Sequence, residues 1–103
     1  MMRIEWTRSA DRDIRNLRNY IAADSESYAD RTVRKIVEAV EKAATFPRVG
    51  RKVPEAEDDT IREMIFGKYR IIYRIEESRV LVLMVIHGAR DLAQAAPKPW
   101  EIE

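Results

Sequence analysis

The sequence predicts an α+β fold with the element order β-α-α-β-β-β, in which a helical hairpin packs on one face of a mostly antiparallel sheet. Three observations lead to this prediction. Residues 3–7 alternate between apolar and polar side chains, residues 10–44 carry apolar side chains at helical spacing, and residues 61–87 hold three apolar segments separated by short turns. Because the helices precede the three strands in one block, we expect helices and strands to form separate layers.

The first strand is predicted over Arg3–Thr7, and Ser9 is expected to cap the helix that follows, because its hydroxyl can accept a hydrogen bond from a backbone N–H of the first turn. Four apolar residues then recur at helical spacing and form one face: Ala10, Ile14, Leu17 and Ile21. The pattern stops at Asp24-Ser25, where the first helix is predicted to end.

A second helix is predicted to begin after Ser25 or Ser27, either of which can act as its N-cap. It should end at Phe46-Pro47, because proline disfavours helical backbone in the residue before it. Its apolar face contains Ala29, Val33, Ile36, Val40 and Ala43, and is widened by Val37 and Ala44. The connection between the helices is short, so we expect a helical hairpin whose apolar faces share one core.

Three strands are predicted in the second half of the chain: Ile61–Phe66, Tyr69–Glu76 and Arg79–His87. The connections Gly67-Lys68 and Glu77-Ser78 have the length of hairpin turns. The last strand is apolar on both faces, so we expect it to be central and covered on both sides. The segment before the strands, Pro47–Thr60, is predicted to be a loop with a solvated acidic half at Glu55–Asp59.

The length of 103 residues predicts a single domain, 1–103, because a chain of this size has room for one hydrophobic core. Two prolines in Ala96–Glu103 exclude a helix interior, so this segment is predicted to be an extended C-terminal tail. The longest apolar run, Val80–Ile86, is far shorter than the roughly 20 residues of a membrane helix. With no signal-like segment at the start, we expect a cytoplasmic protein that does not bind membranes.

Charge and cysteine content narrow the classes of function. The net charge of +1 argues against nonspecific wrapping of nucleic acid by the whole surface. The chain has no cysteine and one histidine, so we expect no disulfide, no metal site and no cofactor.

A local basic patch is nevertheless predicted on the sheet. Side chains alternate between the faces of a strand, so Arg70 and Arg74 share one face, while Tyr69 and Tyr73 share the other. Burying arginine beneath the helices would be costly, so we expect the helices to leave the arginine face open. Residues 61–75 contain four basic side chains and one acidic side chain, which gives a local excess of positive charge. The basic residues are Arg62, Lys68, Arg70 and Arg74, and the acid is Glu63.

The alternative for these arginines is a structural role. Cross-strand ion pairs with Glu63, Glu76 or the acidic Glu55–Asp59 loop would occupy the arginines without any function beyond folding. The sequence alone leaves both interpretations open.

His87, the only histidine, is predicted to lie where the last strand ends and is followed by Gly88 and Arg90. An imidazole titrates in the range that suits a general base, so His87 is a catalytic candidate. A packing role is the alternative.

Several short motifs, taken in order, resemble the RelE/ParE superfamily of small bacterial toxins from type II toxin–antitoxin pairs. The resemblance covers about Ile4 to Leu92. Its elements are Trp6 in the first strand, an Ile14…Leu17…Tyr20-Ile21 helix, Pro47…Gly50-Arg51…Val53-Pro54-Glu55, Ile61-Arg62-Glu63, Tyr69-Arg70-Ile71-Ile72-Tyr73-Arg74, and His87-Gly88-Ala89-Arg90-Asp91. The resemblance implies the β-α-α-β-β-β fold predicted above.

The superfamily has two main activities. RelE-like members cut mRNA in the ribosome with basic side chains and often a tyrosine or histidine near the C-terminus, whereas ParE-like members block DNA gyrase. Arg62, Arg70 and Arg90 fall where RelE-like toxins place a lysine and two arginines, and these three with His87 are the catalytic candidates. However, Met64 falls on the second RelE lysine, and no tyrosine follows Arg90.

The loop at 50–55, the strand at 61–63 and the ending at 87–91 are more typical of the ParE branch. The resemblance therefore implies a non-enzymatic toxin that inhibits DNA gyrase and is neutralised by a ParD-like antitoxin. Arg51, Lys52 and Arg74 are candidates for contacting the target or the antitoxin. The alternatives are a RelE-like, ribosome-dependent mRNA endonuclease and an inactive relative that only binds its antitoxin.

Overall fold

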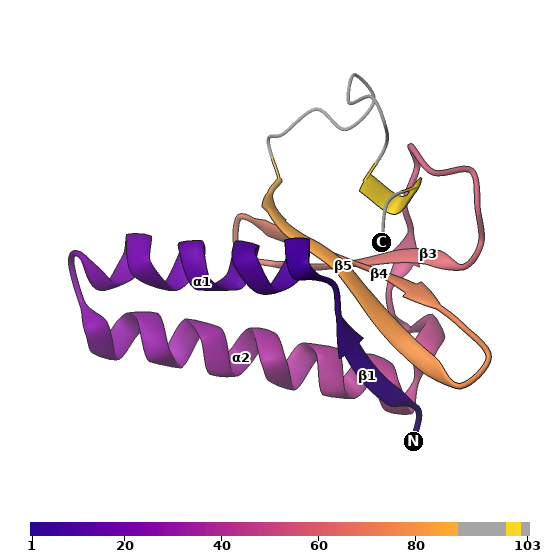
Figure 1. The fold of residues 1–103 in the computed structure, drawn as a ribbon, viewed down its shortest axis with the longest axis horizontal. Helices are drawn as coiled ribbons and strands as arrows, with labels where there is room; N and C mark the ends of the chain where they lie inside the picture. Colours follow the sequence, from indigo (N-terminus) through magenta and orange to yellow (C-terminus); the bar gives the residue numbers. More distant parts are fainter. Residues whose placement is uncertain (89–98, 102–103) are drawn as a thin grey trace.

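A computed structural model of the chain describes residues 1–88 and 99–101 (Figure 1). The elements are β1 (Arg3–Trp6), α1 (Arg8–Ala22), α2 (Glu26–Thr45), η1 (Pro47–Val49), β2 (Arg51–Lys52), β3 (Ile61–Phe66), β4 (Tyr69–Ile75), β5 (Arg79–His87) and η3 (Pro99–Glu101). The sheet has five strands in the order β1-β5-β4-β3-β2. β1 runs parallel to β5, and the other neighbours are antiparallel.

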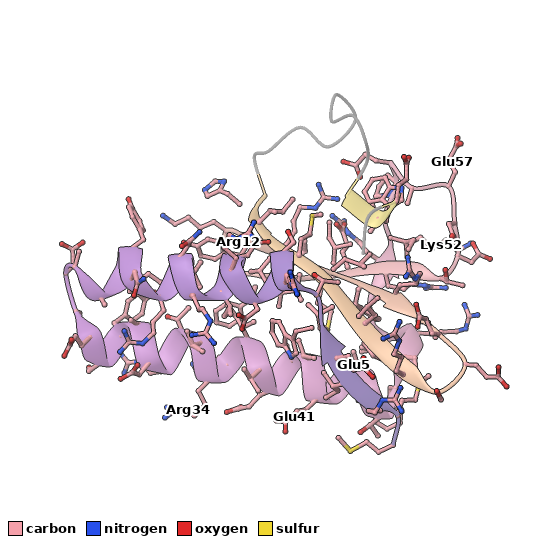
Figure 2. The ribbon with its side chains drawn as sticks, viewed as in Figure 1. Glu5, Arg12, Arg34, Glu41, Lys52 and Glu57 are labelled. Atoms are coloured by element: carbon pink, nitrogen blue, oxygen red, sulfur yellow. The ribbon has the colours of Figure 1, made fainter. Side chains whose placement is uncertain are left out.

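The two helices lie antiparallel on one face of this sheet, so the predicted α+β architecture is confirmed (Figure 1). Charged side chains such as Arg34 and Glu41 point from α2 away from α1 (Figure 2). Within the described ranges, no helix combines the length and the apolar character that a membrane span requires.

The first helix begins at a different cap from the one predicted. Thr7, not Ser9, accepts a hydrogen bond from the Ala10 backbone N–H at 3.0 Å. The Thr7 hydroxyl also donates to the Leu83 carbonyl at 3.0 Å, and the Thr7 N–H donates to the Val82 carbonyl at 3.0 Å. Thr7 is favoured as the cap because β5 fixes its backbone at the point where β1 ends.

The second helix follows the prediction closely. Ser25 is its N-cap and accepts from the Tyr28 N–H at 3.1 Å, and the helix ends at Thr45 before Phe46. Its buried positions include Ala29, Ile36, Val40, Ala43 and Ala44. The prediction for Val37 is wrong, because that side chain is exposed. Val37 lies about 100° around the helix from Ile36, which faces the core.

The three C-terminal strands match their predicted ranges to within one residue, since β4 ends at Ile75 instead of Glu76. Gly67 takes a φ of 56° in the β3–β4 turn, a conformation that glycine adopts without steric cost. β5 lies between β1 and β4, and Val80–Ile86 are all buried, so the central position predicted for this strand is confirmed.

The prediction of a loop over Pro47–Thr60 is wrong in part. Its first half contains the short helix η1 and the strand β2, which pairs with β3 through Arg51↔Glu63 and Lys52↔Arg62. A strand of two residues is too short to show the alternation by which strands are recognised.

The C-terminal tail also departs from the prediction at Pro99–Glu101, which form the short helix η3 instead of an extended segment. Proline is compatible with the first position of a helix, because the backbone N–H that proline lacks would have no acceptor within the helix at that position. Trp100 packs against the apolar cluster on the sheet face that the helices do not cover. The rest of Ala96–Glu103 lies outside the described residues.

Apolar side chains fill both faces of the sheet. Leu17, Ile36, Val40, Ile71, Val82 and Val85 form the cluster between helices and sheet. Val53, Ile61, Ile72, Leu81, Leu83 and Met84 form a second cluster on the opposite face, beneath the 51–56 segment and Trp100. The sheet is therefore a middle layer, and the face opposite the helices is partly covered.

Candidate functional site

Arg70 lies on the sheet face away from the helices, as predicted, but its side chain is not open to solvent. Only 7% of the residue is exposed. Its Nε donates to Glu63 Oε1 at 2.6 Å, and its Nη1 and Nη2 donate to the two carboxylate oxygens of Glu55 at 3.2 and 3.1 Å. The expectation of an open basic surface is therefore wrong at Arg70, and the structural alternative of ion pairing holds.

Glu63 is the centre of this ion-pair network. It is 1% exposed, and its second carboxylate oxygen accepts from Arg51 Nε at 2.5 Å. Arg51 comes from β2 and Arg70 from β4, so the carboxylate bridges the two neighbours of β3. We call Glu55, Arg70, Glu63 and Arg51 the buried ion-pair network. It ties the 51–55 segment to the sheet.

Arg62 lies on the opposite face from Arg70, because it pairs in register with Tyr73, whose face packs against the helices. Its Nε donates to the Asp59 carbonyl at 2.8 Å, and its Nη1 donates to the Gly50 carbonyl at 3.2 Å. The residue is buried. The structure therefore does not bring Arg62 and Arg70, two of the predicted catalytic candidates, onto one surface.

Tyr73 Oη makes two hydrogen bonds with the backbone of the Pro47–Gly50 segment. The Gly50 N–H donates to Tyr73 Oη at 3.0 Å, and Tyr73 Oη donates to the Pro47 carbonyl at 2.6 Å. A Cβ on Gly50 would lie 2.7 Å from the Glu63 carbonyl oxygen, so only glycine fits without a shift. Burial raises the pKa of the Tyr73 hydroxyl above its ordinary value. The motif from Gly50 to Glu55 thus has a structural role that the sequence alone did not disclose.

The remaining basic candidates lie nearer the surface and also have partners. Arg74 donates to Glu76 at 2.9 Å and to the Trp100 carbonyl at 3.2 Å. Lys52 forms an exposed ion pair with Asp59 at 2.8 Å. Exposed pairs of this kind contribute little stability, so Lys52 is readily available to a partner.

His87 lies at the exposed end of β5, opposite Tyr69 on β4. The two rings meet edge to face, with centroids 6.0 Å apart. Arg90, the remaining catalytic candidate, lies outside the described residues. No three acidic or histidine side chains in the described ranges are grouped so that they could hold a metal ion.

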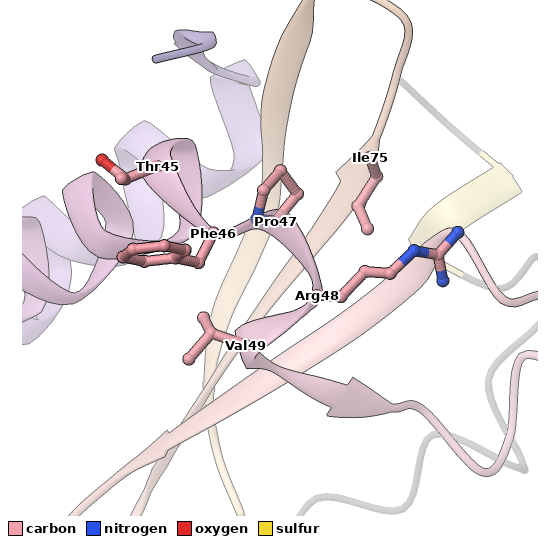
Figure 3. A pocket seen from close by; sticks show the side chains of 6 residues that line it. All are labelled: Thr45, Phe46, Pro47, Arg48, Val49 and Ile75. Carbon is pink, nitrogen blue, oxygen red and sulfur yellow. The ribbon is translucent and has the colours of Figure 1, made fainter.

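The structure also presents an apolar surface beyond the end of α2, formed by residues that the sequence did not mark as exposed. Three large apolar side chains near the end of α2 are well exposed: Phe46 at 63%, Val49 at 44% and Ile65 at 54%. Phe46 and Val49 line a surface pocket of about 600 Å³ with Thr45, Pro47, Arg48 and Ile75 (Figure 3). Exposed apolar patches of this kind mark interaction surfaces. The sequence offers one signal for this surface, the apolar Phe46 directly after α2. An apolar residue at a helix end is hard to distinguish from a residue of the hydrophobic core.

The buried ion-pair network predicts a dependence of stability on pH. Hydrogen bonds from Arg70 lower the pKa of Glu55 below its ordinary value of 4.5, although burial acts in the opposite direction. A carboxyl whose pKa is lowered by folding stabilises the folded state above its unfolded pKa, and this contribution is lost as the pH falls through the folded pKa. We expect the free energy of unfolding to decline below about pH 4.5.

The measurement is urea denaturation across the acidic range, and Glu55→Gln is the informative variant. It should be less stable than the parent at pH 7, and the difference should shrink as the pH falls. Equal pH profiles for the two proteins would show that Glu55 does not contribute.

Comparison with known proteins gives a family and two similar folds. A family model described as "ParE toxin of type II toxin-antitoxin system, parDE" matches residues 4–92. The structure of the chromosomal ParDE toxin–antitoxin system from P. aeruginosa has a chain with a TM-score of 0.69 and 22% identity, covering 84% of this chain and 96% of that one. No curated protein sequence matches the chain.

The crystal structure of the toxin–antitoxin complex RelBE2 from Mycobacterium tuberculosis has a chain with a TM-score of 0.62 and 26% identity, and the match covers 84% of this chain and 96% of that one. Both solved structures share the fold described above, and the matched family region includes every described candidate residue.

Proposed function

Because the chain belongs to the ParE toxin family of type II toxin–antitoxin systems, we propose that it inhibits DNA gyrase and is neutralised by a ParD-like antitoxin. In this proposal the protein acts by binding and performs no chemistry of its own. DNA gyrase works in the cytoplasm, so the proposal places this protein there too.

The observation that carries the proposal is the ion pairing of the Arg70 guanidinium. A ribonuclease needs cations free to contact the phosphates of its substrate, since these contacts position nucleic acid. Here all three nitrogens of the Arg70 guanidinium donate to carboxylates of Glu63 and Glu55. These carboxylates occupy the sites that a phosphate would need, which favours a binding toxin over a nuclease.

Met64 supports the same conclusion. It occupies the position that the RelE pattern gives to a second lysine, and in this structure it packs against the cluster between helices and sheet. Arg62 also lies on the opposite face of the sheet from Arg70. The basic side chains at the RelE-like positions are therefore not gathered on one surface.

A ribosome-dependent mRNA endonuclease is the second candidate, and His87 is the observation that favours it. The imidazole is exposed at the end of β5, where it is accessible to a substrate. The chain also has the same fold as a chain of the RelBE2 complex, in addition to its likeness to a chain of a ParDE system.

His87→Gln separates the two candidates. If His87 acts as a general base in a nuclease, its loss should reduce cleavage about 100-fold or more and abolish growth arrest. In a gyrase inhibitor it is at most a contact, and the variant should remain toxic on induction. Thermal melting should show that the variant stays folded. A folded but non-toxic His87→Gln protein would contradict the proposal.

The antitoxin part of the proposal is tested by co-expression with the adjacent short reading frame. We expect growth arrest when this protein is expressed alone, relief of the arrest on co-expression, and a stable complex on purification. If expression alone has no effect while the complex still forms, the protein is an inactive relative that only binds its antitoxin. If the two proteins purify separately at low salt, the antitoxin proposal is wrong.

A further inference from the structure

The face of α1 that points away from the core carries arginine and asparagine side chains. Ala10 and Leu17 on the inner face are buried, and the residues on the opposite side are exposed. Successive residues of an α-helix are rotated by about 100°, so five exposed residues fall within an arc of about 100° opposite the core. We call them the α1 outer face: Arg8, Arg12, Arg15, Asn16 and Asn19.

The α1 outer face is positively charged, and its arginines are available to a partner. Within the described ranges, Arg8 and Arg12 have no ion-pair partner. Arg15 donates to Asp11 at 2.8 Å, but the two side chains are 73% and 52% exposed, so a stronger anion can replace this pair. The three positive charges follow one another along about two turns of the helix.

The outer face of α2 shows a different pattern. Its exposed residues include charges of both signs: Arg31, Arg34, Glu38 and Glu41. Arg34 lies 4.0 Å from Glu38, so part of this charge is compensated within the helix. On α1, by contrast, two like charges stand four residues apart, a spacing that destabilises a helix. The α1 outer face is therefore better explained by an anionic partner than by a contribution to folding.

α1 presents this face on a rigid support. The Asp13 carboxylate accepts from the Val85 N–H at 3.0 Å, and the Thr7 hydroxyl joins the start of the helix to β5. α1 packs against α2, β5 and β1, and within the described ranges no element covers its outer face. The helical hairpin also extends beyond the sheet (Figure 1). A preorganised surface of this kind loses little conformational entropy when it binds.

Double-helical DNA suits the α1 outer face better than RNA does. The major groove of DNA admits an α-helix, whereas the major groove of an RNA duplex is too deep and narrow for side chains to read. Single-stranded nucleic acid is bound largely through stacked aromatic side chains, and none of the five residues of the α1 outer face is aromatic. Arginine, which is the basic residue at all three positions, contacts phosphate oxygens with two parallel hydrogen bonds.

We propose that the α1 outer face binds double-helical DNA, with Arg8, Arg12 and Arg15 contacting phosphates and α1 lying along the major groove. Asn16 and Asn19 extend the contact by donating to phosphates or base edges. The net charge of +1 fits a local contact of this kind and not wrapping by the whole surface. In the proposed function the DNA is the segment that gyrase holds, so the toxin contacts the enzyme and its DNA together. Only this placement rests on the proposed function.

Fluorescence anisotropy of a labelled DNA duplex of about 20 base pairs measures this binding as the salt concentration is raised. Neutralising three phosphates gives a slope of about −2.7 in a plot of log affinity against log salt concentration. We therefore expect the affinity to fall about 40-fold between about 50 and 200 mM salt. Absence of binding at about 50 mM salt would overturn the proposal.

Arg12→Gln tests the contact on the protein. It removes one phosphate contact, so the affinity at low salt should drop, and its fall over the same range of salt should shrink to about 12-fold. Arg34→Gln is the matched control, because it removes the same charge from an exposed position on α2 and should change neither value. Thermal melting checks that both variants fold. Equal effects of the two substitutions would show that binding follows net charge alone and would overturn the α1 outer face as the site.

Two RNA probes test the choice of partner. A duplex RNA of the same sequence should bind at least about tenfold more weakly than the DNA, because its major groove does not admit the helix. Single-stranded RNA of the same length should also bind more weakly, because the α1 outer face offers no ring on which bases can stack. Equal or tighter binding of either RNA would overturn the assignment to DNA.

A combined variant separates the DNA contact from the proposed function. The protein with Arg8→Gln, Arg12→Gln and Arg15→Gln should lose DNA binding and, with it, inhibition of gyrase supercoiling. If this variant loses DNA binding and still inhibits gyrase, the placement of the contact on gyrase-bound DNA is wrong. DNA binding by a parent protein that does not inhibit gyrase would support the α1 outer face as a DNA site and contradict the proposed function instead.

Discussion

Glu63→Ala should cost about 3–5 kcal/mol of unfolding free energy, the largest effect that we expect from any single charge removal in this protein. The substitution leaves the buried Arg70 guanidinium without its 2.6 Å partner and frees Arg51 from the sheet. A buried charge that loses its partner cannot recover the hydration that it lost on folding. The 51–55 segment should keep its backbone pairing with β3 and the Glu55–Arg70 ion pair, but lose the side-chain contact of Arg51 with the sheet.

Urea denaturation at neutral pH measures this effect. Glu77→Ala is the matched control, because Glu77 is exposed in the turn between β4 and β5, and its loss should change stability by less than about 0.5 kcal/mol. If Glu63→Ala were as stable as Glu77→Ala, the buried ion-pair network would have no part in holding the fold together.

Gly50→Ala should cost about 1–3 kcal/mol, because the added methyl group cannot be accommodated without displacing β3 or Tyr73. It would lie 2.7 Å from the Glu63 carbonyl oxygen and 2.5 Å from Tyr73 Oη. The φ of Gly50 is −75°, which any residue adopts, so the expected loss comes from contact and not from backbone conformation.

Gly67 serves as the control, because its backbone conformation favours glycine while the space around it would admit a side chain. It has a φ of 56°, and a Cβ there would meet nothing within 4 Å. Gly67→Ala should lose about 1–2 kcal/mol through backbone conformation alone, and asparagine, which tolerates this conformation, should recover part of that loss. Asparagine at Gly50 should recover nothing. Recovery at Gly50 would contradict the account of a close contact there.

The regular elements of this fold could be predicted from the sequence because their periodicities differ. Ile36 and Val40 are four residues apart on one helix face, whereas Arg70 and Ile72 alternate with Ile71 in a strand. The cap of α1 could not be predicted in the same way, because Ser9 and Thr7 are chemically alike. Contacts with β5, remote in sequence, decide between them.

The candidate site was only partly predictable for a similar reason. The sequence placed Arg70 on the face opposite the helices, but whether it was open depended on the path of the 51–55 segment. Glu55 is 15 residues from Arg70, and their contact requires β2, whose two residues give no periodic signal. Local charge counts therefore indicated a free basic patch, and the register of β2 on β3 shows a neutralised one.

The exposed apolar surface was missed because exposure is a property of the packed molecule. Phe46 follows a helix with a strong apolar face, and Ile65 lies in a strand whose other residues are mostly buried. Phe46 and Val49 lie at the two ends of η1, and Ile65 lies beyond the residues of β3 that pair with β2. All three side chains are exposed.

The central claim, that this ParE-family toxin inhibits gyrase and is not a nuclease, is tested most directly by two assays run on one purified preparation. One measures supercoiling of relaxed plasmid by DNA gyrase, and the other measures cleavage of mRNA on translating ribosomes. The account predicts dose-dependent loss of supercoiling with intact mRNA. Codon-linked mRNA cleavage with unaffected supercoiling would contradict it.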